Sequence, residues 1–220
     1  MQLETAQIRM CAGIAGADAR TQEQALLSRV RGLPGIRHVA LGRNLAGSWG
    51  AGDYTLDLQF APTSPDSPDQ AAGLAAALKG MAQVDCVTYS PIGGGLRAPQ
   101  LCHGIWRTLM FRVRSQAPEW QVRSLERDLL RMPDYMPGIR NWRLARVLSP
   151  GAWTHVWQQE FASVDDLLGE YLMHPFHWGR VDRWFDPEFP EWTVDAISHA
   201  FCPLATSLIA NHTDREEYAP

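Results

Sequence analysis

The sequence predicts an α+β fold in which two βαββαβ repeats within one chain cover each other's sheets and form a barrel. Three observations lead to this prediction. The tetrapeptide Pro-Gly-Ile-Arg occurs at 34–37 and again at 137–140, and a similar apolar pattern follows each copy. Each half offers the same order of strand-like and helix-like segments. A four-stranded sheet with both helices on one face leaves its other face bare, and a second such sheet can cover that face.

The first repeat is assigned to residues 1–95. Alternating apolar side chains predict its strands, while amphipathic spacing and a high content of alanine and leucine predict its helices. The segment 62–69 is rich in proline and is predicted to be a loop inside this repeat. The predicted strands are 8–14, 36–45, 53–60 and 86–92, and the predicted helices are 21–33 and 68–81.

The second repeat is assigned to residues 105–220, with a C-terminal tail from about residue 203. Pro118 stands near the start of the first helix, predicted over 119–132, where the missing N–H of proline does no harm. Ser163 is a predicted N-cap of the second helix, because two aspartates follow in the first turn. The predicted strands are 105–114, 139–148, 154–161 and a last one near 196–202.

A linker assigned to residues 96–104 joins the two repeats. The run Gly93-Gly94-Gly95 before it leads into no helix, so the connection rich in glycine and proline is taken to begin there. The sequence contains neither GxGxxG nor GxxxxGK[ST], so we expect no nucleotide cofactor.

Composition excludes several classes of protein. Hydrophobic residues make up 45% of the chain and charged residues 20%, and the net charge is −4. Nucleic-acid binding is not expected, because neutralising phosphates needs a clustered basic face. The chain shows no secretory signal and no apolar stretch near the roughly 20 residues of a membrane span. We therefore expect a cytoplasmic protein.

The residues between Trp153 and Asp186 contain the candidate chemistry. Tyr171 and His174 are three apart and share a helix face. Pro175 disfavours helical geometry at His174, so the helix is expected to end or kink there. His177 then follows on a loop or a new short helix that can turn back toward the sheet. His155 lies on a strand, where 155, 157, 159 and 161 face one way and 156, 158 and 160 the other.

Aromatic residues concentrate around these histidines. Six of the nine tryptophans lie between residues 140 and 195. They predict either an aromatic pocket, with Trp157, Trp178 and Trp184 as candidate walls, or a core rich in tryptophan. The segment 181–192 is predicted to be an ordered flap, in which Asp182 or Arg183 orients a histidine or a substrate oxygen.

This stretch resembles the stress-responsive dimeric α/β-barrel (Dabb) family, which includes a plant polyketide cyclase. The family pattern is matched by the residues Thr154-His155, Phe161, Ser163, Tyr171, His174-Pro175, His177 and Asp182. The resemblance implies ferredoxin-like repeats that pair sheet to sheet, here as a pseudo-dimer within one chain that allows a further homodimer. It also implies a catalytic pair, Tyr171 and His177, with His155 and His174 lining or supporting the site.

The first half lacks this motif. No histidine or tyrosine stands where the His-Pro-x-His segment should fall, and Tyr54 occupies the place of His155. We therefore expect the first half to be a structural partner, so that only the second half carries a histidine-bearing site.

The function expected from these residues is acid–base catalysis without a cofactor. His177 would move a proton, Tyr171 would hold an oxyanion, and the tryptophans would hold a small aromatic or polyketide-like molecule while a C–C bond is made or broken. The reaction would be of the aldol or retro-aldol type, catalysed by a cyclase or a lyase. The alternative is a non-catalytic stress-response or ligand-binding barrel. A metal set of His155, His174, His177, Glu160 and Asp182 is less favoured, and no metal is assigned.

Overall fold

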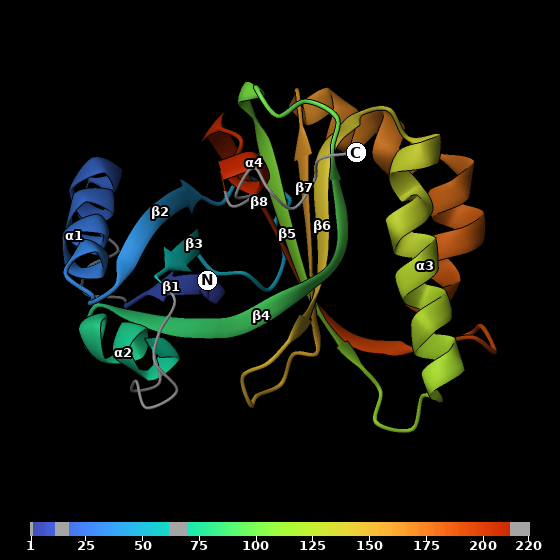
Figure 1. The fold of residues 1–220 in the computed structure, drawn as a ribbon, viewed down its shortest axis with the longest axis horizontal. Coiled ribbons are helices and arrows are strands. Elements are labelled where there is room, and N and C mark those ends of the chain that lie inside the picture. The colour runs from blue at the N-terminus through green and yellow to red at the C-terminus, as the bar shows by residue number, and fades with distance from the viewer. Residues whose placement is uncertain (1, 12–17, 62–69, 212–220) are drawn as a thin grey trace.

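Eight strands form one antiparallel sheet in the order β2-β3-β1-β4-β6-β7-β5-β8. The computed structural model describes residues 2–11, 18–61 and 70–211. In Figure 1 the helices of the first half and the long helix of residues 119–135 in the second half stand at opposite sides, with most of the strands between them. The α+β class and the ferredoxin-like arrangement are confirmed, while the duplication of one repeat stays a prediction from the sequence.

The first half runs strand, helix, strand, strand, helix, strand. Tyr54 begins the third strand, and its hydroxyl donates a 3.1 Å hydrogen bond to Gln22 on the first helix. The predicted loop 62–69 and the first two residues of the predicted helix 68–81 lie outside the described residues. The elements are β1 (Gln2–Met10), α1 (Ala19–Arg31), β2 (Ile36–Arg43), β3 (Tyr54–Phe60), α2 (Gln70–Ala77) and β4 (Ala82–Leu96).

The second half follows the same order, but short π-helical and 3-10 turns replace its second helix. His155 begins the third strand and contacts Glu126 on the first helix, in the manner of Tyr54 and Gln22. The strand predicted near 196–202 continues past the expected tail start at 203. The elements are β5 (Cys102–Val113), α3 (Glu119–Tyr135), β6 (Ile139–Val147), β7 (His155–Phe161), η1 (Asp166–Tyr171), η2 (His177–Val181), η3 (Asp182–Trp184), β8 (Val194–Thr206) and α4 (Leu208–Asn211).

The two halves meet at two places in the sheet. Antiparallel β4 and β6 pair directly. At the other edges, the loop after β2 reaches β8, where the Trp49 N–H donates to the His199 carbonyl at 2.7 Å and the reverse bond measures 2.8 Å. These contacts close the sheet into a barrel that is formed by one chain. Closure removes the exposed edges of the sheet.

The predicted bounds of the first strand were wrong. The first strand is Gln2–Met10 rather than 8–14, of which 12–14 lie outside the described residues. Its side chains Glu4, Thr5 and Gln7 are polar yet buried, because β1 is central in the sheet. These polar residues interrupt the alternation of apolar side chains, so the pattern did not predict the strand at its true position.

The glycine run is part of β4, not of the linker. Gly93, Gly94 and Gly95 pair with Leu144, Arg143 and Trp142 of β6. A β-carbon on Gly95 would lie 2.3 Å from the Trp142 ring. Glycine therefore marks a place where the neighbouring strand approaches closely, and only residues 97–101 separate β4 from β5.

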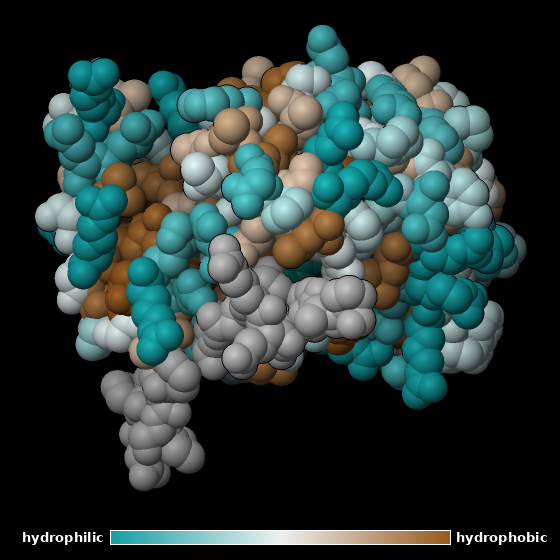
Figure 2. All heavy atoms as spheres, turned by 45° about the horizontal axis from the view of Figure 1, so that its top comes forward, coloured by the Kyte–Doolittle hydropathy of each residue, from teal (hydrophilic) through white to brown (hydrophobic). Residues whose placement is uncertain are grey.

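Each half has its own apolar core between its sheet and its helices. In the second half, Trp157 and Phe161 of β7 face the core under α3, whereas Val156 packs against Leu3 and Tyr89 of the first half. The predicted alternation of this strand is confirmed. On the surface, apolar atoms gather on the side of the first half (left in Figure 2), where the edge strand β2 is only partly buried.

Part of the inner face of the barrel is polar. The Gln158 amide donates to Asp57 at 2.6 Å, and the Tyr89 hydroxyl donates to Asp57 at 3.3 Å. Arg143 in turn donates to Tyr89 at 2.8 Å. Residues of β3, β4, β6 and β7 thus join the two halves through one buried network, which favours a single packing of one sheet on the other.

This network predicts a pH-dependent stability. Burial raises the pKa of Asp57 to about 6, although Arg143 and the hydrogen bonds from Gln158 and Tyr89 oppose the rise. A carboxyl with a higher pKa when folded adds stability below its unfolded pKa and loses it as the pH rises through the folded pKa. We expect the free energy of unfolding in urea to fall by about 1 kcal/mol between about pH 5 and about pH 8 on account of Asp57. Asp57→Asn should remove this part of the slope, while the exposed Asp134→Asn should keep it.

No helix among the described residues is long and apolar enough to cross a membrane.

Candidate functional site

The candidate site lies where η1 and η2 cover the sheet of the second half. Tyr171 at the end of η1 is buried and stands edge-on to Phe161 of β7, with ring centroids 5.5 Å apart. The His177 ring at the start of η2 meets the Tyr171 ring edge-on at 4.9 Å. The structure therefore brings together the two residues that the family resemblance pairs.

The local sequence explains this approach. Ser163 caps the helical segment, since its hydroxyl accepts a 3.1 Å hydrogen bond from the Asp166 N–H, as predicted. The helix is interrupted at His174, directly before Pro175, and a new short segment begins. In π-helical turns residues five apart in the chain become neighbours, and the His177 Nδ1 lies 3.1 Å from the Asp182 carboxylate. His177 is thus held between a buried phenol and a carboxylate at the surface.

Three further polar residues from the sheet surround Tyr171, and sequence reasoning missed them as site residues. Arg107 of β5 places its guanidinium carbon 5.2 Å from the centre of the Tyr171 ring. The Arg107 Nε donates to the His199 Nε2 at 2.9 Å, and its Nη1 donates to the Gln159 Oε1 at 2.6 Å. One sequence signal could have found Arg107: it alternates with Ile105, Leu109 and Phe111 on an otherwise apolar strand face.

The surroundings of these groups set their protonation. Burial raises the pKa of Tyr171, and Arg107 and Gln159 oppose the rise without reversing it. Tyr171 is therefore a phenol at neutral pH and can donate a hydrogen bond. Burial, Arg107 and His177 lower the pKa of His199 to about 3. His199 is therefore neutral, which suits a ring nitrogen that accepts a bond from Arg107.

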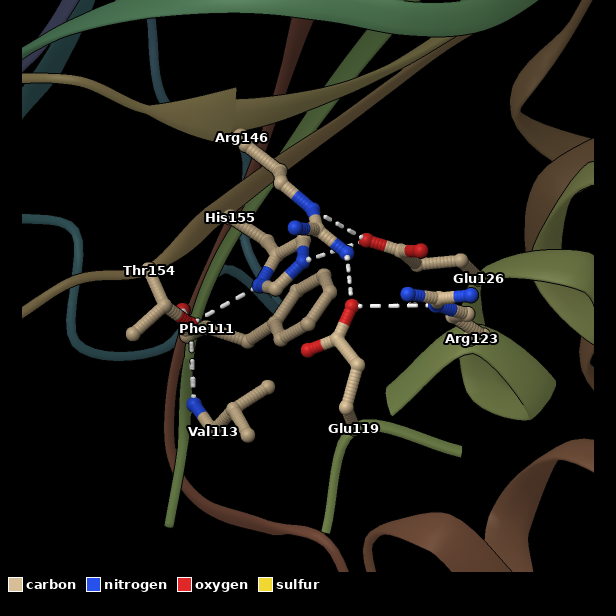
Figure 3. Close-up of polar contacts among 8 residues, drawn as sticks. All are labelled: Phe111, Val113, Glu119, Arg123, Glu126, Arg146, Thr154 and His155. Atoms are coloured by element: carbon tan, nitrogen blue, oxygen red, sulfur yellow. Dashed lines mark hydrogen bonds and ion pairs between the residues drawn. The ribbon is translucent and has the colours of Figure 1, made fainter. Parts of the chain in front are cut away.

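His155 has its own network, shown in Figure 3. Its Nε2 lies 3.1 Å from the Glu126 carboxylate, its Nδ1 lies 2.8 Å from the Thr154 hydroxyl, and its ring stacks on Phe111 at 4.7 Å. Burial would raise the pKa of Glu126, but hydrogen bonds from His155 and Arg146 outweigh it and lower the pKa to about 2. Since both ring nitrogens have protein partners, His155 supports the fold between β7 and α3.

Asp128 of α3 fastens the segment that carries His177. Its carboxylate is fully buried and accepts a 3.0 Å hydrogen bond from the Trp184 indole N–H. The Arg180 Nε lies 3.1 Å and the Arg183 Nη2 3.7 Å from the same oxygen. Arg183 also lies over the Trp184 ring and donates to Glu191. Trp184 and Arg183 therefore anchor η2 and η3 to α3.

The remaining predicted residues lie around the pair. Trp157 is fully buried in the core beneath Tyr171, whereas Trp178 is 58% exposed and donates its indole N–H to the Leu172 carbonyl. His174 accepts a 3.1 Å hydrogen bond from the Phe176 N–H and so ties down the turn at Pro175.

The proposed metal set is not brought together. Glu160 faces the barrel side of β7 and accepts hydrogen bonds from Asn141 and Ser207, on the opposite face from His155. No group of three or more histidine, cysteine, aspartate or glutamate side chains within residues 2–11, 18–61 and 70–211 is placed to hold a metal ion.

A hollow of about 310 Å³ opens at the barrel mouth rather than at Tyr171. It is polar on the side of β1, where Gln7 and Ser198 are hydrogen-bonded to each other. Its lining is Gln7, Arg9, Gly50, Ala51, Gly52, Gln83, Val84 and Asp85.

Several solved structures share this fold over both halves. An anthrone oxidase-like protein has a TM-score of 0.59 and 11% identity, covering 93% of this chain and 91% of that chain. A proposed monooxygenase from Fusobacterium nucleatum subsp. nucleatum has a TM-score of 0.58 and 6% identity, covering 93% of both chains. Another from Lactobacillus acidophilus has a TM-score of 0.54 and 11% identity, covering 93% of this chain and 95% of that one. At these identities the likeness shows the fold alone.

No curated protein matches the sequence. The model of the stress-responsive A/B barrel domain matches residues 105–195. These residues run from within β5 to the start of β8 and so include Tyr171, His177 and Asp182. The second half of the chain is therefore similar to the stress-responsive A/B barrel domain.

Proposed function

We propose that the chain is an enzyme that works by acid–base catalysis without a cofactor on a small aromatic or polyketide-like molecule. The observation that carries this proposal is the row Asp182, His177, Tyr171, with a 3.1 Å contact on one side of the imidazole and a ring contact on the other. An imidazole with a carboxylate on one side and a phenol on the other has the groups that a general base and an oxyanion partner need.

In this reaction His177 removes a proton from a carbon next to a carbonyl, and Tyr171 donates a hydrogen bond to the enolate oxygen that develops. The enolate carbon attacks a second carbonyl, and the alkoxide takes the proton back from His177. The reverse sequence breaks the same C–C bond, so a cyclase and a lyase need the same groups. The burial that keeps Tyr171 protonated also makes its hydrogen bond stronger than in water.

A second candidate is a non-catalytic ligand-binding barrel. Two observations favour it: the Tyr171 side chain is only 2% exposed, and the hollow at the barrel mouth has no contact with the histidines. A ligand at that mouth would contact Gln7 and Arg9 and would leave Tyr171 and His177 as packing residues.

One experiment separates the two functions. Wild-type protein and a Tyr171→Phe/His177→Ala double variant are incubated with a panel of phenolic, aromatic-ketone and linear polyketide-like compounds, and products are followed by mass spectrometry. We expect wild type alone to convert at least one compound with a change in mass or retention time that fits C–C bond formation or cleavage. Equal conversion by both proteins, or conversion by neither, would contradict the enzymatic proposal.

A further inference from the structure

Arg107 is a buried cation without a carboxylate partner. Its side chain is 6% exposed, and no carboxylate oxygen of the described residues lies within ion-pair distance of it. Buried charges in proteins are normally paired, since an unpaired one loses its hydration without compensation. An uncompensated guanidinium beside a candidate active site indicates that the missing negative charge arrives with a ligand.

The neighbours of Arg107 hold it in place without neutralising it. His199 accepts from the Nε and is neutral, so it adds no negative charge. Gln159 accepts from the Nη1 through its Oε1, which fixes the amide so that its Nε2 is presented as a donor. Among the described residues, the hydrogen bonds of Arg107 come from its Nε and Nη1, so the Nη2 group keeps two N–H donors.

Two more buried donors stand next to it. The Gln159 Nε2 and the Trp157 Nε1 are both fully buried, and neither has a hydrogen-bond partner among the described residues. Both side chains approach the Tyr171 hydroxyl and oppose the rise that burial causes in the pKa of Tyr171. Trp157 and Gln159 are alternate residues of β7 and share the face that Arg107 contacts from β5.

We infer that Arg107, Trp157 and Gln159, here called the donor cluster, bind the carboxylate of an aromatic acid substrate. All three present N–H groups, and an oxyanion accepts from all of them at once. The planar guanidinium matches the two oxygens of a carboxylate. The rings of Phe161, Tyr171 and His177 pack edge-on to one another beside this cluster, with Arg107 over the Tyr171 ring. This inference rests on the proposed function, because it assigns the substrate class of the same site.

Binding of benzoate and of its neutral isostere benzamide to the full chain tests the inference by isothermal titration calorimetry. We expect wild type to bind benzoate at least about 10-fold more tightly than benzamide, as a charge-assisted contact in a buried site provides. Arg107→Gln should abolish this preference, because benzoate loses its charge-assisted contact and benzamide loses only a neutral one. The matched control is Arg112→Gln, which changes an exposed arginine of the same strand that pairs with Asp195 and should keep the preference.

A second, milder variant tests the site even where Arg107→Gln does not fold. Trp157→Phe keeps a buried ring and removes the indole N–H, so benzoate affinity should fall by about fivefold. Three results would overturn the inference: no saturable benzoate binding by wild type, equal affinity for benzoate and benzamide, or displacement of benzoate by equimolar sulfate. Calorimetry measures binding without turnover, so a failure of the acid–base proposal in the conversion assay can be distinguished from a failure of the carboxylate site.

Discussion

Replacing His177 with alanine is expected to lower kcat by about 10²- to 10⁴-fold on the compound that wild type converts, since a positioned general base contributes on that order. His177 is the group that exchanges the proton in the proposed reaction, and its partners Asp182 and Tyr171 cannot replace it. Asp182 is at the surface, and the pKa of Tyr171 is raised by burial. KM should change less than kcat, because the donor cluster remains.

Two further measurements make this prediction specific. The His177 side chain is 16% exposed, so added imidazole should reach the space left by the alanine and restore part of kcat. Asp182→Asn should keep the imidazole and lower kcat less than His177→Ala does. The control is His103→Asn, at an exposed position with φ 55°, a backbone conformation that asparagine tolerates. Parental kcat in His177→Ala would exclude this histidine as the base.

The family resemblance implies the pair of Tyr171 and His177, and local signals predict the turn between them. Ser163 starts the helix and Pro175 interrupts it, so that His177 can turn back toward the sheet. The two-residue period of β7 likewise separates His155, Trp157 and Gln159 from Glu160. Such local rules need no knowledge of which strands are neighbours.

The residues that were missed depend on strand pairing. Arg107 meets Gln159 because β5 pairs with β7, and it meets His199 because β5 also pairs with β8. Cross-strand neighbours are set by register, which a single sequence does not specify. The π-helical turns were missed for a related reason, because the predicted period of 3.6 residues cannot anticipate a contact between His177 and Asp182, five residues apart.

The anchoring of η2 and η3 leads to a second large effect, on stability. Asp128→Ala is expected to lower the free energy of unfolding in urea by about 2–4 kcal/mol. The substitution leaves the buried Trp184 N–H without an acceptor and removes the negative charge between Arg180 and Arg183. The partial exposure of Arg180 and Arg183 keeps the loss below that of a fully buried pair, because water compensates part of the charge.

Asp128→Asn separates the two contributions. It keeps an acceptor for Trp184 but removes the charge, so its loss should be smaller than that of Asp128→Ala. Asp134→Ala changes an exposed aspartate of the same helix and should leave stability within about 0.5 kcal/mol of wild type. Trp184 loses its hydrogen bond in Asp128→Ala, so the tryptophan fluorescence should shift in that variant and not in Asp134→Ala. An unaltered urea midpoint in Asp128→Ala would mean that η2 and η3 are held by apolar packing alone. The charge on α3 would then have no part in keeping His177 against Tyr171.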